Sequence, residues 1–270
     1  MKAGLSSLLF ACGKVEEAIE AAARLGYETV EIVYDFPHFG SGKEPAAIEL
    51  KRMINDNSLG VTIHSSFWDL NPASFYPEVR KLTLKRIEKS AMLCAKLDGE
   101  ILVVHPGKCP VPDSLPVYAK SAELYRKFLD ELLPCVKEVG VKVCIENGNS
   151  KDNPYSLLPE LGGLVAEKGI GMTLDVAHAF LRYGSKNVDK IVQDLKKVRC
   201  YVQHVHLHDN LGQRDDHMVP GEGKLKLKKI IDCLREGGYS SIVVAELWNP
   251  KNPWEIAKRA KKALENLGIT

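Results

Sequence analysis

Long apolar segments, paired cysteines and a strong excess of one charge are all missing from this sequence. No apolar run approaches the roughly 18 residues that a membrane-spanning helix requires, and the first residues, Met1 to Leu5, resemble a strand rather than a cleavable signal. The 7 cysteines show no Cys-x-x-Cys spacing, which predicts free thiols in a reducing compartment. We therefore expect a cytoplasmic protein without a membrane partner. A formal net charge of only +2 neither requires nor excludes nucleic acid.

Short β-rich runs recur along the 270 residues, and each is followed by a longer amphipathic stretch. The expected strands cover residues 3–9, 28–33, 60–65, 100–105, 141–147, 170–175, 201–208 and 241–247. The expected helices cover residues 14–25, 44–57, 77–97, 117–139, 156–168, 187–198, 225–236 and 254–267. Eight such units with short connections predict parallel strands that are joined by right-handed crossovers.

These repeats predict an α/β fold, a (β/α)₈ TIM barrel that spans residues 1–270 as a single domain. The alternative is a doubly wound open sheet. Such a sheet usually opens with a Gly-x-Gly-x-x-Gly turn, and no such turn follows the first expected strand. The chain contains no linker or low-complexity segment, so we expect no second domain.

Ionisable residues gather at the ends of six consecutive expected strands, which is where barrel enzymes carry their chemistry. Seven of the 8 histidines lie at these strand ends or in the loop that follows the seventh strand, and His38 is the exception. One such residue alone is more often a hydrogen-bonded rim group than a ligand. Burying so many of them together costs several kcal/mol each unless something compensates. Divalent cations would do so, because imidazole and carboxylate groups are their usual ligands.

The number of these side chains exceeds what one ion accepts. Four of them would hold one ion: Glu146, Asp175, His206 and Glu246. The surplus consists of His64, His105, His178, Asp215 and His217. We therefore expect two to three divalent ions, with zinc as the first choice and manganese as the alternative. The pairs Asp175/His178 and Asp215/His217 are each expected to clamp one ion.

The seventh expected strand carries three histidines on one face, because side chains alternate with a period of two. His206 is the expected ligand, and His208 is expected to be a substrate-binding group at the rim. His204 lies one pleat deeper, so we expect it to be structural.

Several phrases at the strand ends resemble the superfamily that joins endonuclease IV with xylose isomerase-like sugar isomerases and epimerases. They are Val-His-Pro-Gly (104–107), Ile-Glu-Asn (145–147), Leu-Asp-Val-Ala-His-Ala-Phe (174–180), His-Leu-His-Asp (206–209) and Asp-Asp-His-Met-Val-Pro-Gly-Glu-Gly (215–223). The resemblance implies a metal-dependent barrel enzyme. Endonuclease IV holds three zinc ions with nine side chains, and the matching positions here are His64, His105, Glu146, Asp175, His178, His206, Asp215, His217 and Glu246. Epimerases of the group use four of these positions, 146, 175, 206 and 246.

The chain departs from both branches of this superfamily. Endonuclease IV uses longer loops to wedge into DNA, whereas here only Phe67 and Trp68 could act as a wedge. The second acidic residue of the epimerases would fall near Asp152, which is a poor match. Their substrate-binding arginine has only Arg214 as a doubtful counterpart.

Two reactions fit these residues, and the leading expectation is phosphodiester hydrolysis at abasic DNA or a related sugar-phosphate ester. Glu146 would bridge ions and Glu246 would lie beside the nucleophilic water. Lys43, Lys108 and Lys224 would hold DNA phosphates.

The alternative is isomerisation or epimerisation of a sugar or sugar phosphate. Glu146 and Glu246 would then act as catalytic acid and base. The substrate pocket would be closed by the aromatic residues Phe10, Phe36, Phe39, Phe67 and Trp68. A non-catalytic scaffold is disfavoured, because a complete ligand set is costly to keep without chemistry.

Overall fold

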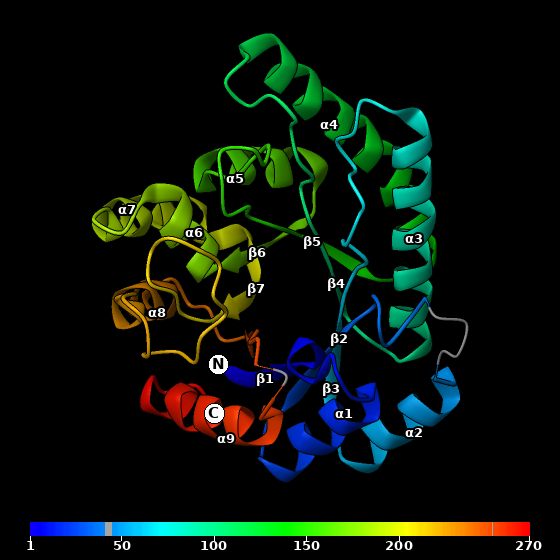
Figure 1. Cartoon of the computed structure of the whole chain (residues 1–270), viewed down its shortest axis with the longest axis vertical. Helices are drawn as coiled ribbons and strands as arrows, with labels where there is room; N and C mark the ends of the chain where they lie inside the picture. The colour runs from blue at the N-terminus through cyan, green and yellow to red at the C-terminus, as the bar shows by residue number, and fades with distance from the viewer. Residues whose placement is uncertain (41–44, 250) are drawn as a thin grey trace.

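Eight parallel strands form a closed barrel in the computed structural model, which describes residues 1–40, 45–249 and 251–270 (Figure 1). The strands pair in sequence order, and β8 returns to β1. They are β1 (Lys2–Ser6), β2 (Thr29–Val33), β3 (Gly60–His64), β4 (Ile101–Val104), β5 (Lys142–Glu146), β6 (Gly171–Asp175), β7 (Val202–Leu207) and β8 (Ile242–Ala245). The predicted (β/α)₈ barrel is therefore confirmed, and each predicted strand overlaps an observed one.

Helices surround the barrel on the outside, as Figure 1 shows. They are α1 (Val15–Arg24), α2 (Ala47–Asp56), α3 (Pro77–Lys96), α4 (Leu115–Glu138), α5 (Leu158–Lys168), α6 (Val176–Tyr183), α7 (Val188–Val198), α8 (Leu227–Glu236) and α9 (Pro253–Asn266). Two short 3₁₀ helices, η1 (Ser7–Phe10) and η2 (Arg199–Tyr201), complete the described elements. Helix α6 follows β6 without a loop, so two helices, α6 and α7, separate β6 from β7. The sequence did not predict α6.

Apolar periodicity explains how strands and helices pack together. The strand β4 is entirely apolar and buried, as expected for a parallel strand that is covered on both faces. Helix α8 buries Leu227, Ile230, Ile231 and Leu234, which share one face at helical spacing. This pattern places the main core between the barrel wall and the surrounding helices. Among the described residues, no helix has the length and apolar character needed to cross a bilayer.

The barrel closes where the two ends of the chain meet. Gly4 of β1 lies opposite Val244 of β8, and a Cβ atom at position 4 would come within 2.8 Å of the Val244 side chain. The Thr270 amide donates to the Met1 carbonyl at 3.1 Å, and the Ala3 amide donates to the Thr270 carbonyl at 2.9 Å. Closure leaves the carboxyl ends of all eight strands at one mouth, which positions the site.

Candidate metal centre

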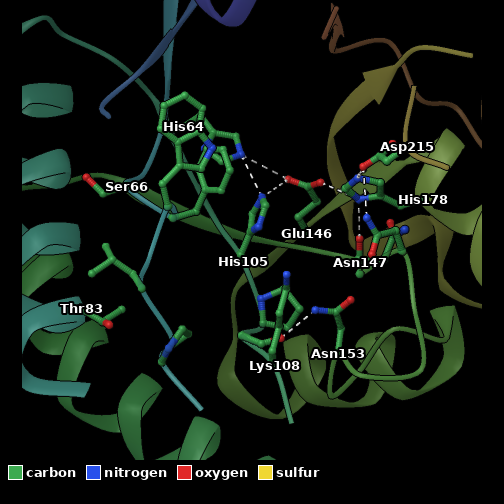
Figure 2. Close-up of a pocket in the computed structure, with 18 of the residues that line it drawn as sticks. His64, Ser66, Thr83, His105, Lys108, Glu146, Asn147, Asn153, His178 and Asp215 are labelled. Atoms are coloured by element: carbon green, nitrogen blue, oxygen red, sulfur yellow. Dashed lines mark hydrogen bonds and ion pairs between the residues drawn. The ribbon is translucent and has the colours of Figure 1, made fainter. Parts of the chain in front are cut away.

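Nine ionisable side chains from six strands and the loops that follow them converge at this mouth. The strands β3, β5 and β6 end on ligand-type residues, His64, Glu146 and Asp175. The Glu146 carboxylate lies between His64 and His105 on one side and His178 and Asp215 on the other (Figure 2). The structure therefore brings together the side chains that the sequence placed at strand ends.

The central group consists of Glu146, Asp175, His206 and Glu246, and one ligand atom from each lies within 4.8 Å of the others. His206 Nδ1 is 3.3 Å from Glu146 Oε2, 3.6 Å from Glu246 Oε2 and 4.0 Å from Asp175 Oδ2. All four residues are buried. One imidazole nitrogen surrounded by three carboxylates is a suitable ligand set for a divalent ion.

A second group, formed by His64, His105 and Glu146, shares its carboxylate with the first. The Nε2 atoms of His64 and His105 are 3.0 Å apart, and Glu146 Oε2 lies 3.6 Å and 3.2 Å from them. The side chain of His105 is 31% exposed, whereas that of His64 is 1% exposed. This group therefore links the buried centre to the open side of the barrel mouth.

The third group consists of His178, His208, Asp215 and His217. Asp215 Oδ2 is 2.8 Å from His178 Nε2 and 3.5 Å from His217 Nε2. Asp215 and His217 thus share a group, as expected. In the other expected pair, Asp175 Oδ2 lies 3.8 Å from His178 Nδ1. Asp175 Oδ1 also caps helix α6 by accepting from the His178 amide at 2.6 Å.

Backbone carbonyls orient three of the histidines. The Nδ1 atoms of His64, His178 and His217 lie 2.9, 3.0 and 2.9 Å from the carbonyl oxygens of Ser65, Asn147 and Glu246. A carbonyl only accepts, so each Nδ1 carries the proton, and in the neutral ring Nε2 is left with its lone pair facing the cluster. Partners of this kind are typical of metal-binding histidines.

Charge in the cluster is unbalanced in a way that a cation would correct. Both oxygens of Glu146 and the Nδ1 atom of His206 are buried without a hydrogen bond. Burial lowers the pKa of His178, but Asp175 and Asp215 outweigh it and raise that pKa well above its usual value. In the same way Glu31, Glu246 and Glu146 raise the pKa of His206 against the effect of burial. The carboxylates thus draw in positive charge, and the donor set fits divalent metal ions.

The remaining expected residues fall in different environments. Phe67 and Trp68 line the cavity above the cluster, and the Phe67 ring stacks on His105 with centroids 4.9 Å apart. His208 is fully buried and lies 3.0 Å from Asp175 Oδ2, behind the cavity. His38 hydrogen-bonds the Phe10 carbonyl at 3.0 Å.

The three rim lysines also differ from one another. Lys108 lines the cavity, while Lys224 is exposed and is not among the residues that line it. Lys43 lies outside the described residues.

Two polar residues that hold the ligand loops were not singled out from the sequence. The side chain of Asn147 bridges β5 to β6. Its Nδ2 donates to the Asp175 backbone carbonyl at 3.0 Å, and its Oδ1 accepts from the Asp175 backbone amide at 2.9 Å. The Asp209 carboxylate accepts from the amides of Asn210, Gly221 and Leu225 at 2.8, 3.0 and 3.1 Å. Asn147 directly follows the predicted ligand Glu146, and Asp209 directly follows the predicted rim residue His208. A small polar residue in that position is the sequence signal that could have identified both.

The loop that follows β7 also carries a candidate ligand with a strained backbone. His217 has a φ of 47°, in the left-handed region that residues other than glycine seldom adopt. The Trp248 amide donates to its carbonyl at 3.1 Å, and its ring Nδ1 donates to Glu246. Such backbone strain persists where surrounding contacts over-determine it, as is common at functional sites.

A cavity of about 450 Å³ opens above the cluster. Its floor includes Glu146 and Glu246, and its walls include Phe67, Trp68 and Lys108. A (β/α)₈ barrel with buried carboxylates and imidazoles beneath a cavity at the strand ends is the architecture of a metal-dependent barrel enzyme.

Comparison with known proteins identifies the family. Residues 19–267 match the xylose isomerase-like TIM barrel family, and the chain belongs to it. A protein of Methanocaldococcus jannaschii is 32% identical over 98% of this chain and 90% of its own length. The crystal structure of a D-tagatose 3-epimerase-like protein has a TM-score of 0.83 and 29% identity, covering 99% of this chain and 98% of that one.

Relatives with named activities fall in both branches of the superfamily. Fructoselysine 3-epimerase of Escherichia coli O157:H7 is 22% identical over 92% of this chain and 90% of its own length. A probable endonuclease 4 of Mycobacterium leprae is 24% identical over 82% of this chain and 86% of its own length. The solved structures that resemble the chain are mostly sugar epimerases, so the comparisons favour the alternative reaction over the leading one.

Proposed function

We propose that this protein is a divalent-metal-dependent epimerase or isomerase of a small sugar or sugar phosphate. One observation carries the proposal: two buried carboxylates, Glu146 and Glu246, meet on the floor of a cavity of about 450 Å³. Cavities of roughly 300–1,000 Å³ are typical of small-molecule sites. Both carboxylates also lie within 4 Å of His64 Nε2, at 3.6 and 3.9 Å.

The two carboxylates are suited to moving one proton on carbon. A divalent ion held by the central group would polarise the carbonyl and hydroxyl oxygens of a sugar. It would thereby acidify the C–H bond of the hydroxyl-bearing carbon next to the carbonyl. Glu246 would accept that proton on one carboxylate oxygen and become protonated. Glu146, protonated from water before the step, would deliver its proton to the carbon and become a carboxylate, and exchange of both groups with water would reset the pair. Delivery to the opposite face inverts the carbon, whereas isomerisation needs delivery to the neighbouring carbon together with a proton shift between the carbonyl and hydroxyl oxygens.

The walls of the cavity suit a polar molecule with one apolar face. Phe67 and Trp68 supply aromatic surface, and Asn149 and Asn153 supply amide groups. Lys108 adds a cation that can pair with a phosphate group on the substrate. Asp35 holds the aromatic wall in place, because its Oδ2 accepts from the amides of Phe67 and Trp68 at 2.8 and 3.0 Å.

Solvent deuterium provides a test that does not require the natural substrate. Protein loaded with manganese, cobalt or zinc is incubated in D₂O with a panel of ketoses, aldoses and their phosphates. We expect one deuteron to enter the carbon next to the carbonyl of a substrate, as read by NMR. Glu246→Gln should lose at least about 100-fold of this exchange, whereas Glu160→Gln on the exposed face of α5 should retain it. If no sugar in the panel exchanges under any metal, the epimerase proposal fails.

Phosphodiester hydrolysis is the second candidate, and the complete set of nine ligand-type residues favours it. The three candidate ligand groups at the barrel mouth exceed what one proton transfer on carbon requires, whereas a multinuclear site suits phosphoryl chemistry. Nicking of a synthetic abasic duplex at two salt concentrations separates the candidates. DNA cleavage should weaken steeply with salt because phosphate contacts release counterions, and sugar turnover should not. If the protein cleaves abasic DNA, replacing Phe67 and Trp68 with alanine should impair cleavage of the duplex but spare a small phosphodiester. If the protein converts sugars, the same replacement should reduce sugar turnover.

A further inference from the structure

A charged residue lies inside the barrel beneath the metal centre, where neither proposed reaction uses it. Glu31, in the middle of β2, is fully buried. Its Oε2 accepts from His204 Nε2 at 2.8 Å and from Thr62 Oγ1 at 3.1 Å, and its Oε1 lies 3.0 Å from His206 Nε2. Barrel interiors are usually filled by branched apolar side chains. A buried carboxylate costs several kcal/mol unless it is compensated, so its presence here requires an explanation.

His206 differs from the other oriented histidines of the centre. His64, His178 and His217 each place Nδ1 against a backbone carbonyl and turn Nε2 toward the cluster. His206 has the opposite arrangement, with Nδ1 facing Glu146 at 3.3 Å. No described residue makes a hydrogen bond to either nitrogen, and the contact with Glu31 is at ion-pair distance rather than a well-aligned hydrogen bond. Glu31 is thus the group that faces Nε2 of His206.

We propose that Glu31, braced by His204 and Thr62, is the positioning residue that keeps the proton of His206 on Nε2 and so presents Nδ1 to the metal centre. Carboxylates face both ring nitrogens, but with an ion bound on the Nδ1 side only Glu31, 3.0 Å from Nε2, is left to accept the ring proton, which favours the tautomer with hydrogen on Nε2. A negative partner behind an imidazole also strengthens the ring as a ligand, and loss of such partners typically weakens metal binding by 10–100-fold. The inference requires a divalent ion in the centre but holds for either proposed reaction.

The zinc-loaded protein, labelled with ¹⁵N-histidine, tests the proposal directly. The nitrogen of His206 that carries hydrogen is read by long-range ¹H–¹⁵N NMR, with His206→Asn used to assign the signal. We expect the proton on Nε2 and zinc on Nδ1. A proton on Nδ1 in the unaltered protein would overturn the proposal without any variant of Glu31.

Metal affinity gives the second measurement, by competition of zinc with a chromophoric chelator. Glu31→Leu and the milder Glu31→Gln should weaken one ion by about 10–100-fold without lowering the number bound at saturation. Glu28→Gln, at an exposed carboxylate directly before β2, is the matched control and should change the affinity by less than about threefold. Unchanged affinity in both Glu31 variants, or the loss of a whole ion, would contradict a positioning role. In the latter case Glu31, His204 and His206 would themselves hold a cation.

Discussion

At the scale of single residues, Glu146 connects all three ligand groups. Its Oε2 faces His206, His64 and His105, and its Oε1 lies 2.9 Å from His178 Nδ1. We expect Glu146→Gln to lower the number of bound ions by at least one and to abolish turnover, because an amide is a much weaker ligand than a carboxylate. Elemental analysis of protein prepared without chelator measures this, with Glu160→Gln as the control. A full ion complement in Glu146→Gln would mean that Glu146 is not a ligand.

Proton binding at His217 makes the stability of the metal-free protein depend on pH. Burial lowers the pKa of His217, but the Asp215 and Glu246 carboxylates outweigh it and raise that pKa to about 9. The resulting stabilisation is complete below the unfolded pKa of about 6.5 and is lost as the pH rises through about 9. Between these values, metal-free protein should lose more thermal stability than its His217→Asn variant, in which asparagine tolerates the left-handed backbone. Melting temperatures of the two proteins that fall equally with pH over this range would contradict the prediction.

The convergence of the candidate ligand residues was predictable from the sequence because a parallel barrel brings all strand ends to one mouth. A histidine or acid at a strand end therefore signals its position without knowledge of the rest of the fold. Glu31 was missed because it lies inside a strand, where one charged residue among apolar neighbours resembles ordinary alternation. Only the contacts with His204 and His206 across the barrel reveal its place, and those depend on register.

At the scale of elements, the loop after β7 is organised by one carboxylate. Asp209 accepts from three loop amides and pairs with Met218 through the backbone, and the loop carries Asp215 and His217. We expect Asp209→Ala to release about one ion and to cost about 1–3 kcal/mol, since buried amides lose their acceptor. Metal analysis and denaturant unfolding measure the two effects. Asp113→Ala, at an exposed ion pair with Lys151, is the control. Retention of every ion would show that the loop does not depend on Asp209.

Strands and most helices were predicted closely, because hydrophobic periodicity is a local property of the sequence. Predicted helix 77–97 corresponds to α3 (Pro77–Lys96), and predicted strand 170–175 corresponds to β6 (Gly171–Asp175). The short helix α6 was missed because its apolar run continues directly from β6. The omitted helix also explains why Asp175 and His178 lie together, since side chains three residues apart share one face of a helical turn.

At the scale of the whole molecule, ions in the centre should contribute to the stability of the fold, since six strands supply their ligands. An ion present at 100 times its dissociation constant stabilises the native state by about 2.7 kcal/mol. For a chain of this size, removal by a chelator should lower the melting temperature by roughly 5–10 °C, and added zinc or manganese should restore it. An unchanged melting temperature after verified removal would mean that the barrel forms the site independently of metal.

The reaction was harder to predict than the fold because the two ligand sets are nested. The four epimerase positions, 146, 175, 206 and 246, are all contained in the nine endonuclease IV positions. Ligand identity alone therefore cannot separate the two activities. The depth of the cavity and the placement of Phe67 and Trp68 depend on loops whose shape is not a periodic property of the sequence.

Exposure within the ligand cluster increases from its centre toward its edge, and this gradient has a kinetic consequence. The side chains of the central donors are 0–6% exposed, whereas those of His105, Asp215 and His217 are 31%, 23% and 18% exposed. The central group lies at the floor of the cavity, deeper than these three side chains. Residence times should therefore differ, with outer ions leaving first and the central ion leaving last. Rapid mixing with excess chelator should resolve release into separate phases, so brief dialysis would yield a partly stripped protein.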